Sequence, residues 1–223
     1  MGKDKHTLRA FGLAFICVAW AGACASQQAA PEASTVAAKG QVGDPKYQWK
    51  SPNGWKGGSF RLPPKDFAPD LGFRGREVLR FSPGYFKGDA HDAWTYAFVL
   101  MVDEVGDLPP ARLERELHTY FLGLGRNLGK KRQANLSADE IAVEHVESTA
   151  AGGGKARMQH TFRATVFDSW STQAPVDINL KVDVWLCEGN AHQAVFVSAS
   201  PLPYSDDVWQ SLVAERETFR CGA

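Results

Sequence analysis

The ten residues DINLKVDVWL, numbered 177–186, decide the fold of this chain. Their apolar residues alternate with polar ones at a period of two, which is typical of a strand with one face on a core and the other turned outward. A turn at 188–190 reverses the chain into 191–200, whose apolar residues fall on both faces, as in a central strand. The two segments therefore predict a β-hairpin.

A helix is predicted after the hairpin. Ser205 is its candidate N-cap, Asp206 and Asp207 suit the positive first turn, and apolar residues at helical spacing follow. We expect this helix to pack on the sheet, on the face that carries Leu180 and Val182.

The chain before the hairpin predicts more strands and one long helix. The helix runs from 109 to 129, with prolines suited to its start and Gly129 to its end. Its charged face is interpreted as solvated: Arg112, Glu114, Arg115, Glu116 and Arg126. The predicted strands are 59–62, 76–81, 94–105, 141–148 and 156–167. Residues 47–58, rich in aromatics and glycine, indicate a loop or a sheet edge. This order of elements predicts an α+β fold, a mostly antiparallel sheet with two main helices packed on it.

The first residues predict export. Lys3, Lys5 and Arg9 precede an uncharged run that is too short for an ordinary transmembrane helix and ends in small residues. We interpret 1–23 as a signal peptide, 24–45 as a flexible tether, and 46–223 as a single α+β domain.

The segment AGAC, 21–24, resembles part of a bacterial lipobox and predicts a lipid on Cys24. The expected location is then the bacterial cell envelope, as a lipoprotein facing the periplasm or the cell exterior. Cleavage after ACA, 23–25, would instead remove Cys24 and give a soluble periplasmic or secreted protein.

The net charge of the chain limits the classes of partner that it is expected to bind. The chain has 25 Lys and Arg against 25 Asp and Glu, and cleavage before Cys24 leaves a net charge of about −2. This balance provides no cationic footprint for nucleic acid and no polybasic membrane patch. The expected partners are another envelope protein or a glycan, with the membrane reached through the lipid anchor.

Two cysteines lie in the last part of the chain: Cys187 is near the hairpin turn, and Cys221 follows the last helix. An oxidising envelope favours a disulfide between them. The alternation of side chains along the strand argues against this disulfide. It points Cys187 away from the face of Leu180, where the helix is expected. Two free buried cysteines are the alternative.

The order of elements from Ser59 to Cys221, with an aromatic-rich last helix that ends in ETFR (217–220), resembles the α/β/α sandwich of PsbP-like proteins. These are the family of the photosystem II extrinsic subunit and of many exported bacterial lipoproteins. The resemblance implies a non-enzymatic role in docking to, or assembling, other envelope proteins. The long helix and the strand at Trp94, with the lead-in FAPDLG (67–72), also resemble uncharacterised exported bacterial proteins, which implies no function.

The sequence lacks the short motifs of common enzymes. The glycine stretches at 123–125 and 152–155 do not meet phosphate-loop spacing, and no GxSxG elbow occurs. Glu114 and His118 lie one helical turn apart, which is more typical of a surface ion pair than of a zinc site. We therefore predict neither a cofactor nor a metal site.

One polar constellation depends on strand pairing. If 156–167 pairs antiparallel with 177–186, these residues share a face: Arg157, Gln159, Thr161, Arg163, Asn179, Lys181 and Asp183. An ordinary solvated face is the simpler interpretation. The functional alternative is a binding face for a protein or an anionic glycan, with the arginines as forked donors.

Two functions follow. The favoured one is a non-catalytic binding or assembly module of the cell envelope, because export signals are present and catalytic motifs are not. The alternative is a small envelope hydrolase or metal-dependent enzyme whose site assembles from distant residues. Its candidates are His91, Asp92, His118 and His160, although His91 and Asp92 are more simply part of a solvated turn. A pocket that gathers two or more of them would favour the enzyme.

Overall fold

The computed structural model describes residues 46–222, apart from 51–53, 132–135, 151–157 and 190. The predicted signal peptide and tether, with Cys24, lie outside the described residues, and so do Arg157 and the glycines at 152–154. None of the helices in the described part of the chain is long and apolar enough to span a membrane.

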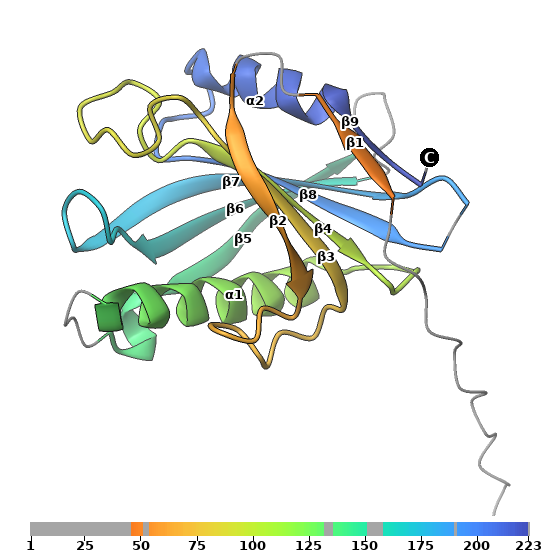
Figure 1. Cartoon of the computed structure of the whole chain (residues 1–223), viewed down its shortest axis with the longest axis horizontal. Helices are drawn as coiled ribbons and strands as arrows, with labels where there is room; N and C mark the ends of the chain where they lie inside the picture. Colours follow the sequence, from red (N-terminus) through yellow and green to blue (C-terminus); the bar gives the residue numbers. More distant parts are fainter. Residues whose placement is uncertain (1–45, 51–53, 132–135, 151–157, 190, 223) are drawn as a thin grey trace, which may run out of the picture. The chain divides into compact units, whose positions relative to one another are not determined.

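Seven strands form one sheet in the order β2-β3-β4-β8-β7-β6-β5, and every neighbouring pair is antiparallel (Figure 1). Their bounds are Lys56–Leu62 (β2), Gly75–Phe81 (β3), Tyr96–Val102 (β4), Ala142–Ala150 (β5), Met158–Phe167 (β6), Pro175–Leu186 (β7) and Gln193–Ser200 (β8). The predicted hairpin is β7 and β8, and the predicted pairing of β6 with β7 is confirmed. Strand β4 is buried along its whole length, as expected of a strand that is apolar on both faces.

Helix α1, Pro110–Lys131, covers one face of this sheet, and helix α2, Val208–Thr218, covers the other (Figure 1). A one-turn 3₁₀ helix, Ala138–Glu140, precedes β5. The result is a three-layer α+β fold with two apolar cores, one between α1 and the sheet and one between the sheet and α2. The α+β prediction with a mostly antiparallel sheet is therefore confirmed.

The predicted docking face of α2 is wrong. Leu180 and Val182 belong to the core under α1, whereas Trp209 and Leu212 of α2 pack in the opposite core. The reason is that β4 and β8 are apolar on both faces, so each face of the sheet has enough apolar surface for its own helix. Cys187 consequently points toward α2, and a disulfide joins it to Cys221.

A small second sheet closes the α2 layer. Strand β1, Tyr47–Trp49, pairs antiparallel with β9, Phe219–Cys221. The prediction placed Phe219 in the last helix, but the helix ends at Thr218 and Phe219 is already extended. The indole nitrogen of Trp49 donates a hydrogen bond to the Glu215 carbonyl oxygen at 3.1 Å, which ties β1 to α2.

The helix ends differ from prediction. Ser205 does not cap α2; the Asp206 carboxylate accepts a hydrogen bond from the Val208 amide at 3.0 Å. Helix α1 continues through Gly129 to Lys131, so Gly129 is not its C-cap.

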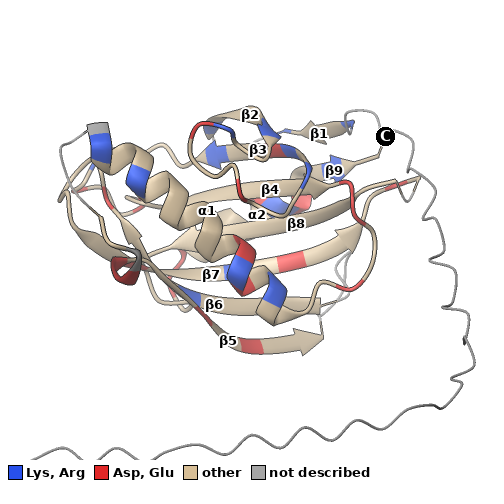
Figure 2. Ribbon diagram, turned by 90° about the horizontal axis from the view of Figure 1, so that it is seen from below, with Lys and Arg blue, Asp and Glu red and all other residues tan. Residues whose placement is uncertain are grey.

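The charged face of α1 is only partly solvated. Figure 2 shows positive and negative residues of the described chain spread over α1 and the strands rather than gathered by sign. Glu116, predicted to be solvated, is buried, and its carboxylate accepts a hydrogen bond from the Gly72 amide at 2.6 Å. The segment before β3 therefore covers this side of the helix.

Candidate functional site

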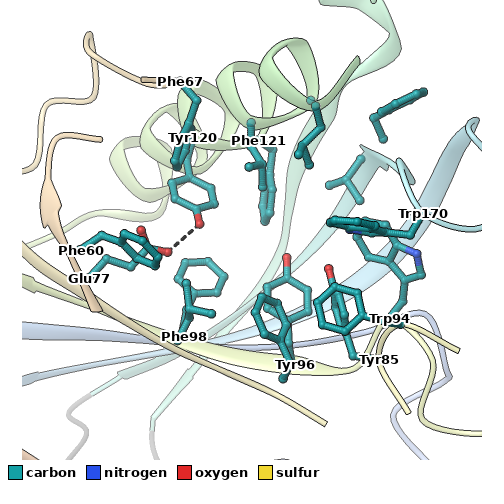
Figure 3. Close-up of a pocket in the computed structure, with 18 residues that line it drawn as sticks. Phe60, Phe67, Glu77, Tyr85, Trp94, Tyr96, Phe98, Tyr120, Phe121 and Trp170 are labelled. Carbon is teal, nitrogen blue, oxygen red and sulfur yellow. Dashed lines mark hydrogen bonds between the residues drawn. The ribbon is translucent and has the colours of Figure 1, made fainter. Parts of the chain in front are cut away.

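A cavity of about 290 Å³ lies between α1 and the sheet (Figure 3). We call it the aromatic cavity, because twelve of its eighteen lining residues are aromatic. The lining consists of Phe60, Phe67, Glu77, Leu79, Phe81, Tyr85, Phe86, Trp94, Tyr96, Phe98, Tyr120, Phe121, Leu124, Gly125, Leu128, Val166, Phe167 and Trp170. It includes one acid and no basic residue.

Strand alternation and helical spacing place these side chains. Glu77, Leu79 and Phe81 share the α1 side of β3, because residues two apart on a strand point to the same face. Tyr96 and Phe98 do the same on β4, and their rings stack at a centroid distance of 5.8 Å. The sheet therefore presents a floor of aromatic rings to α1.

Glu77 is the one charged group in this lining. Glu77 is 1% exposed, and the Tyr120 hydroxyl donates a hydrogen bond to the Oε1 atom of Glu77 at 2.6 Å (Figure 3). Burial raises the pKa of Glu77 from 4.5 to about 7, and the hydrogen bond from Tyr120 opposes that rise. Within the described residues, Tyr120 is its only hydrogen-bond partner. The carboxyl group thus changes charge near neutral pH inside an apolar enclosure.

Two further polar groups face the cavity. The hydroxyls of Tyr85 and Tyr96 point into it (Figure 3), and both residues are buried. Neither hydroxyl makes a hydrogen bond with another described residue. Burial raises the pKa of each phenol, so both stay protonated at neutral pH. Because they face the cavity and have no partner among the described residues, the two hydroxyls are available to a ligand that enters it.

The cavity reaches the surface at exposed aromatic residues. Phe60, Phe86 and Trp170 all line it and are 54%, 55% and 49% exposed. The rings of Phe86 and Trp170 meet edge to face at 5.2 Å. These three residues form an apolar rim around the opening.

Asp168 orders the loop that carries Trp170. Its carboxylate accepts hydrogen bonds from the amides of Trp170, Ser171 and Thr172, at 2.8, 3.0 and 2.7 Å. Burial alone would raise the pKa of Asp168, but these hydrogen bonds outweigh it and lower the pKa below its usual value. The rim is therefore built on a turn that is stabilised by an ionised carboxylate.

Trp94 adopts an unusual backbone conformation at the cavity wall. Its φ is +57°, in the left-handed region that is costly for a bulky residue. Strain of this kind persists where the surrounding structure fixes it, and it gathers at functional sites. The strained backbone at Trp94 places its indole against the ring of Tyr85, at a centroid distance of 5.5 Å.

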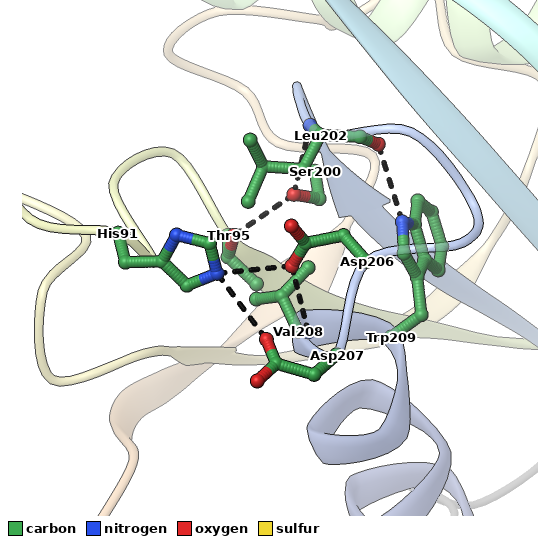
Figure 4. Close-up of polar contacts among 8 residues, drawn as sticks. All are labelled: His91, Thr95, Ser200, Leu202, Asp206, Asp207, Val208 and Trp209. Carbon is green, nitrogen blue, oxygen red and sulfur yellow. Dashed lines mark hydrogen bonds and ion pairs between the residues drawn. The ribbon is translucent and has the colours of Figure 1, made fainter.

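The predicted acid-base candidates do not form a site. The His91 Nε2 atom lies 3.0 Å from Asp206 and 3.2 Å from Asp207, at the start of α2 (Figure 4). Hydrogen bonds from His91 to Asp207 and Asp206 raise its pKa. The three ligand atoms lie within 4.8 Å of one another, close enough for a metal ion. However, His91 and Asp207 are exposed and Asp206 already accepts a hydrogen bond from the Val208 amide, so these contacts are explained by a link between a loop and the start of α2.

The other three candidates are separate. Asp92 accepts a hydrogen bond from the Gly84 amide, and His118 contacts the Ile141 carbonyl oxygen at 3.2 Å. His160 is hydrogen-bonded through Nδ1 to the Ser148 hydroxyl at 2.7 Å. Four cavities in the described part of the chain each contain at most one of the four candidates.

The predicted polar face exists, but α2 and its preceding loop cover part of it. Asp183 is buried and paired with Arg216 of α2 at 2.8 Å. Lys181 lies over the rings of Tyr204 and Trp209, each at 5.0 Å. The other contacts are Gln159 to Asp183 at 3.1 Å and Asn179 to the Leu202 carbonyl oxygen at 3.1 Å. Arg163 stays exposed and Thr161 half-buried. A role of this face in binding a partner stays a prediction.

Sequence reasoning missed the aromatic cavity. A signal was present in residues 76–81, where Glu77 shares the strand face of Leu79 and Phe81. A lone acid on the apolar face of a strand predicts a buried carboxyl group. The cluster of aromatics at 81–98 was a second signal.

No protein-family model matches the chain, and no curated protein matches it. Among solved structures it is similar to LpqN, involved in cell envelope biogenesis of Mycobacterium tuberculosis. The identity is 12% and the TM-score 0.34, over 83% of this chain and 88% of that chain. A similarity this low carries no argument about this chain. The predicted resemblance to PsbP-like proteins stays a prediction.

Proposed function

We propose that this protein is a non-catalytic binding module of the bacterial cell envelope and that it binds a small apolar ligand in the aromatic cavity. The observation that carries the proposal is an open, ring-lined cavity into which two tyrosine hydroxyls without a described protein partner point. Ligand sites commonly combine a mostly apolar wall with a few polar groups that fix orientation, and the cavity volume is near the lower end of their range.

The rim supports uptake of an apolar molecule. Large exposed apolar side chains that lie next to one another mark binding sites more often than isolated ones do. Phe60, Phe86 and Trp170 are exposed where the cavity opens, so an apolar ligand meets apolar surface before it enters.

Export supports the envelope part of the proposal. The N-terminal pattern predicts removal of a signal peptide and attachment of a lipid to Cys24. Mass spectrometry of the chain isolated from cells tests this: a lipid on Cys24 is expected, and an unmodified chain that begins at Ser26 contradicts it.

Fluorescence titration tests the cavity. We expect purified full-length protein to bind N-phenyl-1-naphthylamine, a neutral apolar probe that brightens in apolar surroundings, saturably and at one site with micromolar affinity. Leu124→Trp places a larger side chain in the cavity from α1 and should weaken binding at least about tenfold, because the probe and the indole compete for space.

The matched control is Val213→Trp, which adds the same side chain at an exposed position on α2, on the other side of the sheet. It should bind the probe as the wild type does. Displacement of the probe by unlabelled 1-naphthylmethanol checks the same site without any substitution. A probe signal that does not saturate, or that both tryptophan variants change equally, contradicts the proposal.

A further inference from the structure

The charge of the cavity lining restricts the ligand. Glu77 is the only ionisable group there besides the three tyrosines, and no lysine, arginine or histidine lines the cavity. An anionic ligand would face a buried carboxyl group without any cation to balance it, which is costly in a low-dielectric enclosure. The occupant is therefore neutral or cationic.

The surroundings of Glu77 favour a cation. Its carboxyl group has one hydrogen bond, from Tyr120, and no salt bridge links it to a described residue. Figure 3 shows it in a wall formed by aromatic side chains that include Phe60, Phe98 and Tyr120. The rings of Phe98 and Tyr120 stack at 5.4 Å. Aromatic faces attract cations, so a positive group beside Glu77 gains from the rings and from the carboxylate.

The two unpaired hydroxyls suit the same group. An ammonium has three N–H donors and no acceptor, so it needs several acceptors in a confined space. The Glu77 carboxylate is one, and the Tyr120 hydroxyl lies beside it; the hydroxyl oxygens of Tyr96 and, farther from Glu77, Tyr85 can accept from other donors of the ligand. The remaining wall is apolar and suits a ring or a branched hydrocarbon.

We propose that the aromatic cavity binds a compact organic amine, whose ammonium group pairs with Glu77 and whose apolar body packs on the aromatic rings. This proposal rests on the proposed function, because it names the ligand class of the same cavity. The volume of the cavity suits a body of about two or three aromatic rings.

Calorimetric titration of full-length protein with a matched pair of probes tests this. The probes are 1-naphthylmethylamine, a cation, and 1-naphthylmethanol, which has the same ring system and a neutral group. At pH 8, where Glu77 is ionised, the amine should bind at least about tenfold more tightly than the alcohol. Lowering the pH to 6 should remove most of this preference, because Glu77 is then protonated. The three tyrosines that line the cavity, at positions 85, 96 and 120, keep their protons over this range because burial raises the pKa of each.

Two variants complete the test. Glu77→Gln keeps the size of the side chain and removes its charge, so the ratio of the two affinities should fall to about one. Glu144→Gln removes an exposed carboxylate of β5 that does not line the cavity, and it should keep the preference for the amine.

The outcomes separate the two proposals. If neither probe binds, both the proposed function and the ligand class are wrong. If the alcohol binds as tightly as the amine at pH 8, or if Glu77→Gln keeps the preference, the proposed ligand class is wrong. The proposed function, binding of an apolar ligand in the cavity, is then still supported.

Discussion

At the scale of single residues, Glu77 is held where its charge is disfavoured. It lies on the core side of β3 among aromatic rings, with the Tyr120 hydroxyl as its hydrogen-bond donor. A buried acid of this kind lowers the stability of the fold at high pH, and such groups gather at functional sites. Its protonation therefore links folding stability to the chemistry of the cavity.

The pH dependence of stability follows from the pKa of Glu77. The folded chain keeps this proton up to about pH 7, whereas the unfolded chain releases it near pH 4.5. The contribution to stability is therefore fully present below pH 4.5 and is lost as the pH rises through 7, a total of about 3 kcal/mol. Glu77→Gln should abolish this loss.

Urea unfolding of wild type and Glu77→Gln at pH 5 and pH 8 measures the effect. The variant should gain stability relative to the wild type as the pH rises, because Gln cannot ionise. An equal change in both proteins between the two pH values would show that Glu77 is not buried as an acid.

Residue-level prediction from sequence succeeded where alternation alone decides which way a side chain points. It placed Gln159 and Asp183 on one face of an antiparallel pair, and the register of β6 and β7 puts them opposite each other. It did not show that Asp183 is buried, because the cover comes from Arg216, more than 30 residues further along the chain. It likewise interpreted His91, with Asp92, as part of a solvated turn and did not predict its contacts with Asp206 and Asp207 at the start of α2.

At the scale of elements, two of the three glycines in α1, Gly123 and Gly125, have different surroundings. A Cβ on Gly123 would lie 2.1 Å from the Phe67 carbonyl oxygen, so the loop before β3 lies directly against the helix there. A Cβ on Gly125 would have ordinary contacts, 3.4 Å from Leu136 and Phe167 side-chain atoms. Close packing at Gly123 agrees with the sequence interpretation of this stretch as part of a helix.

Alanine at these two positions should have opposite effects. Gly125→Ala should stabilise the protein by about 0.5–1 kcal/mol, because alanine is the better helix former and the space is available. Gly123→Ala should destabilise it by about 1–3 kcal/mol, because backbone atoms would have to move apart. Urea unfolding of both variants measures the difference, and stabilisation by Gly123→Ala would contradict the contact with Phe67.

The sequence predicted the type of each main element but not all their ends. The apolar stripe of α1 and the alternation in β7 have one interpretation each, because their periods differ clearly. The end of α2 was missed, because Phe219 fits the helical spacing and also pairs with Trp49 in the small sheet. Only the pairing with Trp49 in the folded structure decides that Phe219 lies in a strand and not in the helix.

At the scale of the whole described fold, the sheet separates two apolar cores that differ in structure. The α1 side contains the aromatic cavity, and the α2 side is tied by the small sheet and the disulfide. Composition and element order predicted two helices on one sheet. Which helix covers which face could not be predicted, because β4 and β8 are apolar on both sides.

Loss of the disulfide should destabilise the fold without removing the cavity. Cys187 and Cys221 are separated by 34 positions, and a loop of this length contributes about 3–4 kcal/mol. Replacing both with Ser should lower the free energy of unfolding by roughly this amount, and reductant should then have no further effect. Mass measurement after alkylation provides the control: equal masses of the wild type with and without reduction would show that the bridge is absent.

The central claim is that the space between α1 and the sheet is a ligand site, and a crystal structure of the full-length protein soaked with N-phenyl-1-naphthylamine tests it most directly. The account predicts probe density in the aromatic cavity, against the rings of Tyr96 and Phe121 and within reach of the polar groups on the sheet side. A cavity filled by its own side chains, with the probe absent or bound elsewhere, would contradict it.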